Sequence, residues 1–185
     1  MNQQSATYIL TASCPGQSGT VDVVTRFLRE FGCYINELNS FDDALNHRFF
    51  IRTVFRVEDN TPLDQSAFCT RFAERAKVFD MEWALTPSDY RPRVVIMVSK
   101  YDHCLNDLLY RYRTGNLPVD IRAVISNHPD LQSLAEWHEL PYYHFPITAD
   151  TKPQQEAQVQ AVLDETGCEL LILARYMQVL SHDMC

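Results

Sequence analysis

The stretch LLILARYMQVL, residues 170–180, decides the fold of the second half of this chain. Its first five residues form a short apolar run, which is typical of a strand buried on both faces of a parallel sheet. In open α/β sheets, ligands bind in the crevice at the carboxyl ends of such strands. We therefore expect residues 175–180 to form a binding loop.

Strands and helices alternate through the residues that precede this stretch. The expected strands are 94–98, 121–126, 142–145 and 169–174. Three helices are expected between them: one that begins after the N-cap Asp102, one at 131–137 and one at 153–166. Strict alternation of this kind predicts a doubly wound, Rossmann-like parallel sheet.

The first half has a different order of elements. We expect strands at 8–13, 33–39, 49–57 and 78–85, a helix of about 13 residues that ends at Gly32, and a helix at 62–77 with Thr61 as its N-cap and Pro62 in its first turn. The order β-α-β-β-α-β is that of the ferredoxin-like fold. Two prolines then mark residues 87–92 as a linker, so we divide the chain into domains at 1–86 and 93–185.

Composition excludes several classes of protein. The chain has 185 residues, 46% of them apolar, and a net charge of −8. An acidic chain does not favour nucleic acid as a partner, and no apolar run approaches the roughly 18 residues that span a bilayer. Six cysteines without a C-x-x-C pair indicate reduced thiols and a cytoplasmic location. The spacing of histidines and cysteines predicts no metal site.

Three segments of the second half resemble the formyltransferase family that uses formyltetrahydrofolate. They are VVIMVS at 94–99, VISNHPD at 124–130 and LILARYMQVL at 171–180, in the order of the N-terminal half of that family's domain. The resemblance implies that the loop backbone at Met177, Gln178, Val179 and Leu180 holds the pterin ring. A competing interpretation makes these residues the start of a helix that packs into the core.

The segment SKYDHCL, residues 99–105, points to the hydrolytic branch of this family. The transferase that acts on glycinamide ribonucleotide has a glycine-rich phosphate loop there, whereas this chain has no glycine between Gly32 and Gly115. Asp102 would place a carboxylate at the helix N-terminus and occupy its free amides, although it is also consistent with a simple helix cap. A hydrolase needs no phosphorylated acceptor, because water takes the formyl group.

The resemblance therefore implies hydrolysis of 10-formyltetrahydrofolate to formate and tetrahydrofolate, which would feed purine biosynthesis and one-carbon balance. We expect no tightly bound cofactor, with 10-formyltetrahydrofolate as the substrate. His103 and His128 follow expected strands and are candidates to line the cleft, although His103 is also consistent with a cap or surface residue. Two alternatives remain open: a formyltransferase with a non-phosphorylated acceptor, and a non-catalytic amino-acid-binding regulatory protein.

The catalytic residues of the family are expected outside this chain. The resemblance places an Asn, a His and an Asp beyond Cys185, where they would polarise the formyl oxygen, move the proton and position the water. The strand at 169–174 would also lie at an unprotected edge of its sheet. We therefore expect the chain to be the N-terminal two thirds of a longer enzyme and to be inactive alone.

The first half resembles ACT domains, small regulatory modules that often sense an amino acid, through its size, its element order and the loop CPGQSG at 14–19. Any small ferredoxin-like module would fit the same pattern, and Gly16 and Gly19 are consistent with a tight turn alone. The resemblance implies an amino-acid effector, with glycine and methionine as candidates. It also implies a homodimer or homotetramer. Arg48, Arg52 and Arg56 on one strand face are consistent with such a contact between subunits and equally with a solvated surface. The implied effector residues are Pro15, Gly16, Gln17, Ser18, Gly19 and Thr20, with Asn36 on the next strand.

Overall fold

The structure is a computed structural model that describes residues 6–59, 61–148 and 150–185. The chain divides into two compact units, Met1–Asp89 and Tyr90–Cys185. Each unit contains its own four-stranded sheet. Among the described residues, no helix has the length and apolar character that crossing a membrane requires.

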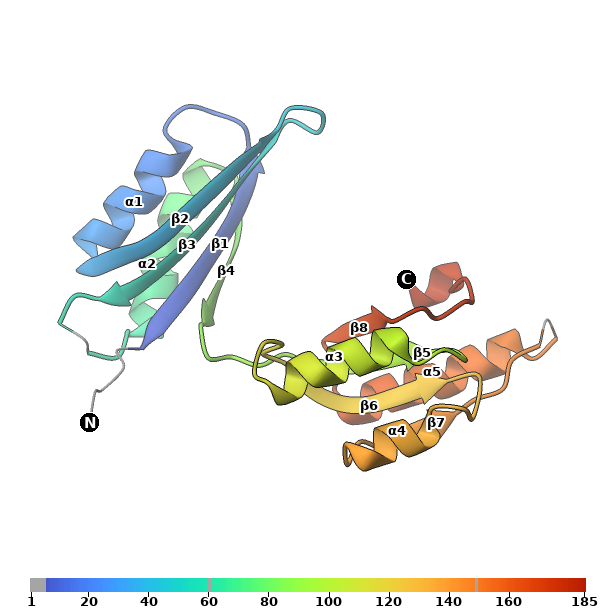
Figure 1. Cartoon of the computed structure of the whole chain (residues 1–185). Helices are drawn as coiled ribbons and strands as arrows, with labels where there is room; N and C mark the ends of the chain where they lie inside the picture. The colour runs from blue at the N-terminus through green and yellow to red at the C-terminus, as the bar shows by residue number, and fades with distance from the viewer. Residues whose placement is uncertain (1–5, 60, 149) are drawn as a thin grey trace. The chain divides into compact units, whose positions relative to one another are not determined.

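The first unit is a βαββαβ sandwich of one sheet and two helices. Its elements are β1 (Thr7–Pro15), α1 (Thr20–Glu30), β2 (Cys33–Asp43), β3 (Arg48–Val57), α2 (Gln65–Val78) and β4 (Glu82–Pro87). The strands are antiparallel in the order β2-β3-β1-β4, and both helices cover the same face of the sheet (Figure 1). This is the ferredoxin-like arrangement that the element order predicts.

Alternation along β3 explains why one face of this sheet is covered. Ile51 and Phe55 are buried, while Arg52 between them is exposed. Phe55 stacks on Phe68 of α2 with ring centroids 5.4 Å apart, and Phe27 of α1 meets the same ring edge-on at 5.1 Å. These aromatic rings form the centre of the core and fix both helices against the sheet.

The expected start of the second helix is wrong. Helix α2 begins at Gln65, three residues later than expected, because the Asp64 side chain accepts a hydrogen bond from the Ala67 amide at 3.0 Å. Thr61 and Pro62 precede this cap and lie outside the helix. The following strand also begins later than expected, at Glu82, since Val78 still belongs to α2.

The second unit is a parallel sheet with helices on both faces. Its elements are β5 (Arg93–Val98), α3 (His103–Arg113), β6 (Asp120–Ser126), α4 (Gln132–Trp137), β7 (Tyr142–His144), α5 (Lys152–Thr166), β8 (Leu170–Leu173) and the short 3-10 helix η1 (His182–Met184). Helices α3 and α4 pack on one face of the sheet, and α5 packs on the other (Figure 1). The prediction of a doubly wound parallel sheet is confirmed.

The strand order β7-β6-β5-β8 creates a topological switch point. The chain proceeds outward from β5 through β6 to β7 and then returns to place β8 on the other side of β5. Loops that leave the carboxyl ends of β5 and β8 therefore diverge, and such a divergence forms the crevice in which α/β proteins bind ligands.

Burial differs between these two neighbouring strands. Val94 to Val98 of β5 have no or almost no exposed surface, whereas Leu170 and Leu173 of β8 are 51% and 46% exposed. The expectation that β8 is buried on both faces is wrong, because β5 is its only strand neighbour among the described residues.

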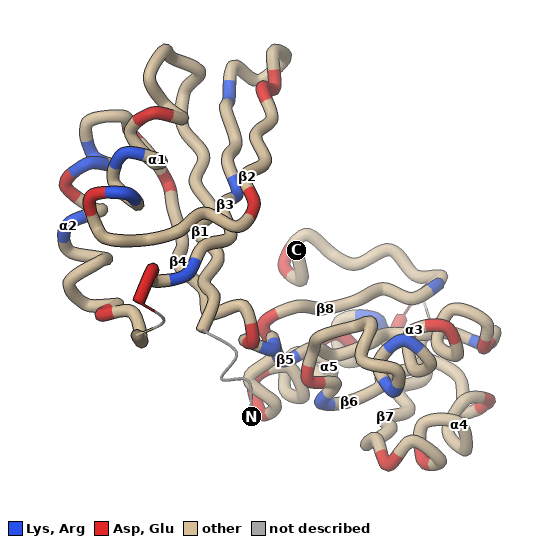
Figure 2. The backbone as a smooth tube through the Cα atoms, turned by 60° about the vertical axis from the view of Figure 1, so that its left-hand side comes forward, with Lys and Arg blue, Asp and Glu red and all other residues tan. Residues whose placement is uncertain are grey.

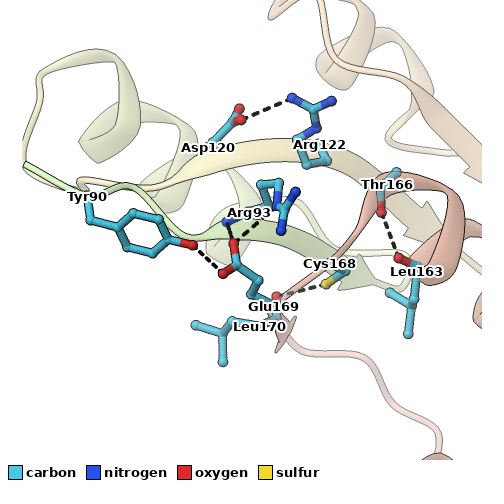
Figure 3. A network of polar contacts seen from close by, with 9 residues as sticks. All are labelled: Tyr90, Arg93, Asp120, Arg122, Leu163, Thr166, Cys168, Glu169 and Leu170. Atoms are coloured by element: carbon cyan, nitrogen blue, oxygen red, sulfur yellow. Dashed lines mark hydrogen bonds and ion pairs between the residues drawn. The ribbon is translucent and has the colours of Figure 1, made fainter. Parts of the chain in front are cut away.

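A polar network fastens the amino ends of β5 and β8 (Figure 3). The Glu169 carboxylate accepts hydrogen bonds from the Arg93 amide at 2.9 Å, from Arg93 Nε at 3.2 Å and from the Tyr90 hydroxyl. The bond from the Arg93 amide, followed by that from Tyr90, holds the pKa of Glu169 below its ordinary value of 4.5. This end of the sheet is therefore occupied by structural contacts, which leaves the carboxyl ends for a site.

Charges in the described residues are mixed in sign. Figure 2 shows Lys and Arg interspersed with Asp and Glu along the helices of both units, without a long stretch of one sign. Several are paired locally, such as Arg26 with Asp22 and Arg111 with Asp107, each at 2.8 Å. Such exposed pairs contribute little to stability.

Candidate functional site

The Ser99 hydroxyl joins three segments at the carboxyl edge of the parallel sheet. Ser99 directly follows β5 and is 5% exposed. Its Oγ donates to Asn127 Oδ1 at 2.8 Å and accepts from the Met177 amide at 3.2 Å. Because Asn127 follows β6 and Met177 follows β8, one hydroxyl fixes the relative positions of three loops. Sequence reasoning missed this role; the available signal was a serine directly after an apolar strand.

A second serine supports the loop after β6. Ser126, which is fully buried, accepts a hydrogen bond from the His128 amide at 3.0 Å. The Tyr142 hydroxyl donates to the His128 carbonyl oxygen, and burial raises the pKa of Tyr142. The backbone of His128, a half-buried residue, is thereby held at the carboxyl end of β6.

Arg175 links the loop after β8 to the loop after β5. Its Nη1 lies 3.2 Å from His103 Nε2, and its guanidinium carbon lies 4.5 Å from the centre of the Tyr101 ring. A guanidinium only donates hydrogen bonds, so Nε2 is the acceptor in this contact. The structure thus brings His103 to the switch point, in contact with the first residue of the expected binding loop, to which sequence reasoning gave no role of its own.

The predicted pterin-binding residues form a loop in which Leu180 is half-buried and the other three are exposed. Met177 and Val179 are 66% and 84% exposed, and Gln178 is exposed as well. No described residue forms a hydrogen bond with the backbone amides of Gln178, Val179 or Leu180. The Met177 amide is already bonded to Ser99 and cannot serve a ligand. The competing interpretation is wrong about a helix start, because these residues are irregular and the short helix η1 begins only at His182. Its expectation of core packing is met by Leu180 alone, which is half-buried against the core.

Both ends of this loop are anchored in the unit. Before it, Tyr176 is 8% exposed and its hydroxyl accepts a hydrogen bond from the buried Gln155 amide group at 3.0 Å; burial raises the pKa of Tyr176. After it, the Ser181 amide donates to Glu156 Oε1 at 2.9 Å. The exposed residues therefore project from a fixed base.

The expected capping role of Asp102 is wrong. Asp102 lies at the N-cap position of α3, but its backbone has right-handed helical angles (φ −88°, ψ −23°) and its side chain does not bond the helix amides. A capping residue normally has extended angles, which aim its oxygen at the first turn. Instead, Asp102 Oδ2 accepts from the Asn106 side chain at 2.8 Å. The carboxylate remains next to the helix N-terminus without occupying its amides.

In the first unit, the predicted effector loop borders a pocket of about 450 Å³. Its lining residues are Gly16, Gln17, Asp42, Ala44, His47 and Phe49. Asn36 lies elsewhere: it occupies a bulge in β2 where the partner residues are Val54 and Phe55. Those residues pair with the opposite end of β1 from Pro15. At about 3.3 Å per strand residue, the separation along the sheet is roughly 20 Å.

A larger pocket, of about 580 Å³, lies over β1–β4 of the same unit. Sequence reasoning missed it, although the aromatic Phe50 on the outward-facing side of the alternating β3 strand was a signal. Its lining residues are Thr11, Ala12, Ser13, Asn39, Ser40, Phe41, Phe50, Ile51, Arg52, Glu82, Trp83 and Ala84.

The three arginines of β3 have partners within the chain. Arg48 bonds Ser13 at 2.7 Å and lies 3.3 Å from Glu82, while Arg52 lies 3.1 Å from Glu37. Arg56 stacks over an aromatic ring. These contacts occur inside one copy of the chain, so each arginine has an intramolecular partner and is not simply solvated.

The two units define the class of protein: a ferredoxin-like module followed by a doubly wound α/β domain whose switch point carries an anchored loop. Residues 92–185 match the model of the Formyl transferase family, and the chain belongs to that family. The resemblance inferred from the three sequence segments is confirmed.

Particular relatives share both units. The chain is 45% identical to the formyltetrahydrofolate deformylase of Corynebacterium sp. (strain P-1) over 96% of this chain and 62% of the relative, and 37% identical to that of Bacillus subtilis (strain 168) over 94% and 58%. A formyltetrahydrofolate deformylase structure from Pseudomonas putida KT2440 superposes with a TM-score of 0.89 at 57% identity, covering 97% of this chain and 64% of that one. The chain thus spans about three fifths of the length of these relatives.

Proposed function

We propose that the complete gene product hydrolyses 10-formyltetrahydrofolate to formate and tetrahydrofolate, and so feeds purine biosynthesis and one-carbon balance. The observation that carries the proposal is the anchored, exposed loop after β8 at the switch point of a formyltransferase-family sheet. Relatives named formyltetrahydrofolate deformylase that match across both units support the same activity.

The loop suits a pterin ring. Such a ring is planar, with donors and acceptors along its edge, and the unengaged amides of Gln178, Val179 and Leu180 are complementary to that edge. The apolar side chains of Met177 and Val179 are exposed and available for its faces. Met177 takes part through its side chain and carbonyl, since its amide is bonded to Ser99.

The acceptor is water in this proposal. The loop after β5 contains no glycine, and the Asp102 carboxylate stands beside the N-terminus of α3. A phosphate there would be repelled by Asp102. His103 and His128 line the crevice, and 10-formyltetrahydrofolate is a substrate that is bound and released rather than a resident cofactor.

We further propose that residues 1–86 form an ACT-like regulatory domain, joined by the linker 87–92 to the catalytic domain that begins at residue 93. Its effector is an amino acid, with glycine and methionine as candidates, at residues Pro15 to Thr20. The roughly 20 Å between this loop and Asn36 within one chain means that a site using both requires a second copy. A homodimer or homotetramer provides that copy.

Formate release tests the activity. The complete gene product is incubated with 10-formyltetrahydrofolate in the absence of glycinamide ribonucleotide and of added amines, and formate is measured. Release well above the uncatalysed rate is expected, and a rate equal to the uncatalysed one contradicts the proposal. Turnover that appears only on addition of an amine would instead indicate a transferase.

A variant pair tests the loop. Val179→Asp places a carboxylate against the pterin face and is expected to raise KM about tenfold or more, the effect of about 1.4 kcal/mol. Val179→Ala keeps the backbone and the neutral surface and is the matched control, with a smaller effect. Residues 1–185 alone are expected to give no turnover, which the same assay checks.

A further inference from the structure

Arg175 has no acidic partner among the described residues. In the segments that the structure describes, no Asp or Glu lies within ion-pair distance of its guanidinium. Asp102, in the loop after β5 that Arg175 contacts, accepts a hydrogen bond from Asn106 along α3 instead. By contrast, Arg93, Arg111 and Arg122 of the same unit each lie 2.8–3.2 Å from a carboxylate.

Two side chains that carry no carboxylate hold this cation in place. His103 accepts one of its N–H groups at 3.2 Å, and the Tyr101 ring lies 4.5 Å from its guanidinium carbon. A guanidinium has five N–H groups in a fixed fork, and this bond uses one of them. Neither neighbour neutralises its charge, and Lys100, exposed directly after Ser99, adds a second positive charge to the same loop.

The backbone at Arg175 is also unusual. Its φ of 57° lies in the left-handed region, which residues other than glycine rarely adopt. The residue stands between the buried Ala174 and Tyr176 at the exact turn where the chain leaves β8. Strained backbone of this kind concentrates at ligand sites, and here it projects a long cationic side chain across the switch point toward the loop after β5.

We propose that Arg175, positioned by His103 and Tyr101, is a carboxylate-binding residue of the crevice. The fork of an arginine matches the two oxygens of a carboxylate. The identity of the carboxylate rests on the proposed function, which supplies two: the glutamate tail of the folate substrate and the formate product. Asp102 in the adjoining loop would repel a doubly charged phosphate more strongly than a singly charged carboxylate.

The first experiment measures carboxylate binding at Arg175 and does not require catalytic turnover. The complete gene product is modified with phenylglyoxal, which reacts with accessible arginines, and the rate at Arg175 is followed by mass spectrometry. Sodium formate and sodium glutarate are each compared with sodium chloride at equal ionic strength. Protection of Arg175 by at least one carboxylate, with Arg91 unaffected, is expected; equal rates at Arg175 in all three salts overturn the proposal.

The second experiment identifies the source of the carboxylate through Arg175→Gln. If Arg175 binds the glutamate tail, the variant raises KM for 10-formyltetrahydrofolate about 10- to 100-fold and leaves KM for 10-formyltetrahydropteroate, which lacks glutamate, unchanged. If it binds formate, the inhibition constant for formate rises by a similar factor and the ratio of the two KM values stays constant. Either outcome supports the site.

Matched variants complete the test. Arg122→Gln removes the same charge at the opposite end of the sheet, and Arg175→Lys keeps the charge without the fork, so we expect no effect from the first and an intermediate effect from the second. If Arg175→Gln changes neither the ratio of the two KM values nor the inhibition constant for formate relative to Arg122→Gln, the proposal is overturned. Absence of turnover in the unmodified protein would contradict the proposed function alone, because the protection experiment does not depend on it.

Discussion

The Met177 amide nitrogen lies 3.2 Å from the hydroxyl oxygen of Ser99, a residue 78 positions earlier in the chain. Since the same hydroxyl donates to Asn127, the loop after β8 is tied to the ends of both β5 and β6. The geometry of the candidate site therefore depends on one buried oxygen atom.

Replacing Ser99 by alanine is expected to loosen this loop. The Met177 amide and the Asn127 side chain both lose their partner, which should lower the free energy of unfolding by about 1–3 kcal/mol. Hydrogen exchange at the Met177 amide should accelerate more than at amides of β5. Ser133→Ala on the exposed surface of α4 is the control; equal effects of the two substitutions would show that the bond is unimportant.

The buried pair of Gln155 and Tyr176 allows a double-mutant cycle. Tyr176→Phe leaves the 2% exposed Gln155 amide without its acceptor and is expected to cost about 1–3 kcal/mol in urea unfolding. Adding Gln155→Leu should recover part of that loss, because both polar groups are then removed. Strictly additive losses would argue against the pairing.

Alanine substitutions at two glycines distinguish the cost of backbone strain from the cost of steric crowding. Gly167→Ala and Gly115→Ala both place a side chain at positive φ, at 59° and 76°, which costs about 1–2 kcal/mol. At Gly167 the added Cβ would also lie 3.2 Å from Arg93 Nη1, whereas nothing lies within 4 Å at Gly115. The larger loss of thermal stability is therefore expected for Gly167→Ala, and equal losses for the two variants would be evidence that Arg93 moves freely.

Glu169 gives the second unit a pH dependence of known sign. Its pKa is held below 4.5, chiefly by the Arg93 amide and then by Tyr90, so its stabilisation is present above pH 4.5 and is lost as the pH falls through the lowered value. The melting temperature of Glu169→Gln should therefore fall below that of the unmodified protein at pH 7 and approach it under acid. Glu165→Gln, at an exposed position of α5, should show no such convergence.

The thiols should differ in reactivity. Burial raises the pKa of Cys33 to about 11, so it is almost entirely protonated at pH 8 and should resist iodoacetamide. Cys185 is exposed and should be alkylated first, as peptide mapping would reveal. Rapid labelling of Cys33 in the folded protein would indicate that the α1–β2 junction opens.

The element order of both units was predictable because its signals are local. Period-two alternation over 49–57 and the apolar run at 94–98 each specify a strand without reference to the rest of the chain. The start of α2 was not, because Thr61 and Pro62 carry the same signals as a true helix start. Only the bond from Ala67 to Asp64 decides between them.

The place of the candidate site was also predictable, since it follows from the position of an apolar strand before a polar loop. Its internal contacts were not. The link from Ser99 to Met177 depends on the register that sets Met97 opposite Leu173, and sequence spacing carries no register between distant strands. Nor does sequence indicate that Arg175 adopts a left-handed conformation, because arginine has no preference for it.

The anchoring of the loop at Met177 and at Ser181 has a consequence for the thermodynamics of binding. Ordering one residue of flexible backbone costs about 1–2 kcal/mol of conformational entropy. A loop of this length that is already tethered at both ends loses much of that entropy when the protein folds, rather than when a ligand arrives. The free energy of binding then depends mainly on how well a heterocycle fits the loop, because little of it is used to order the loop itself.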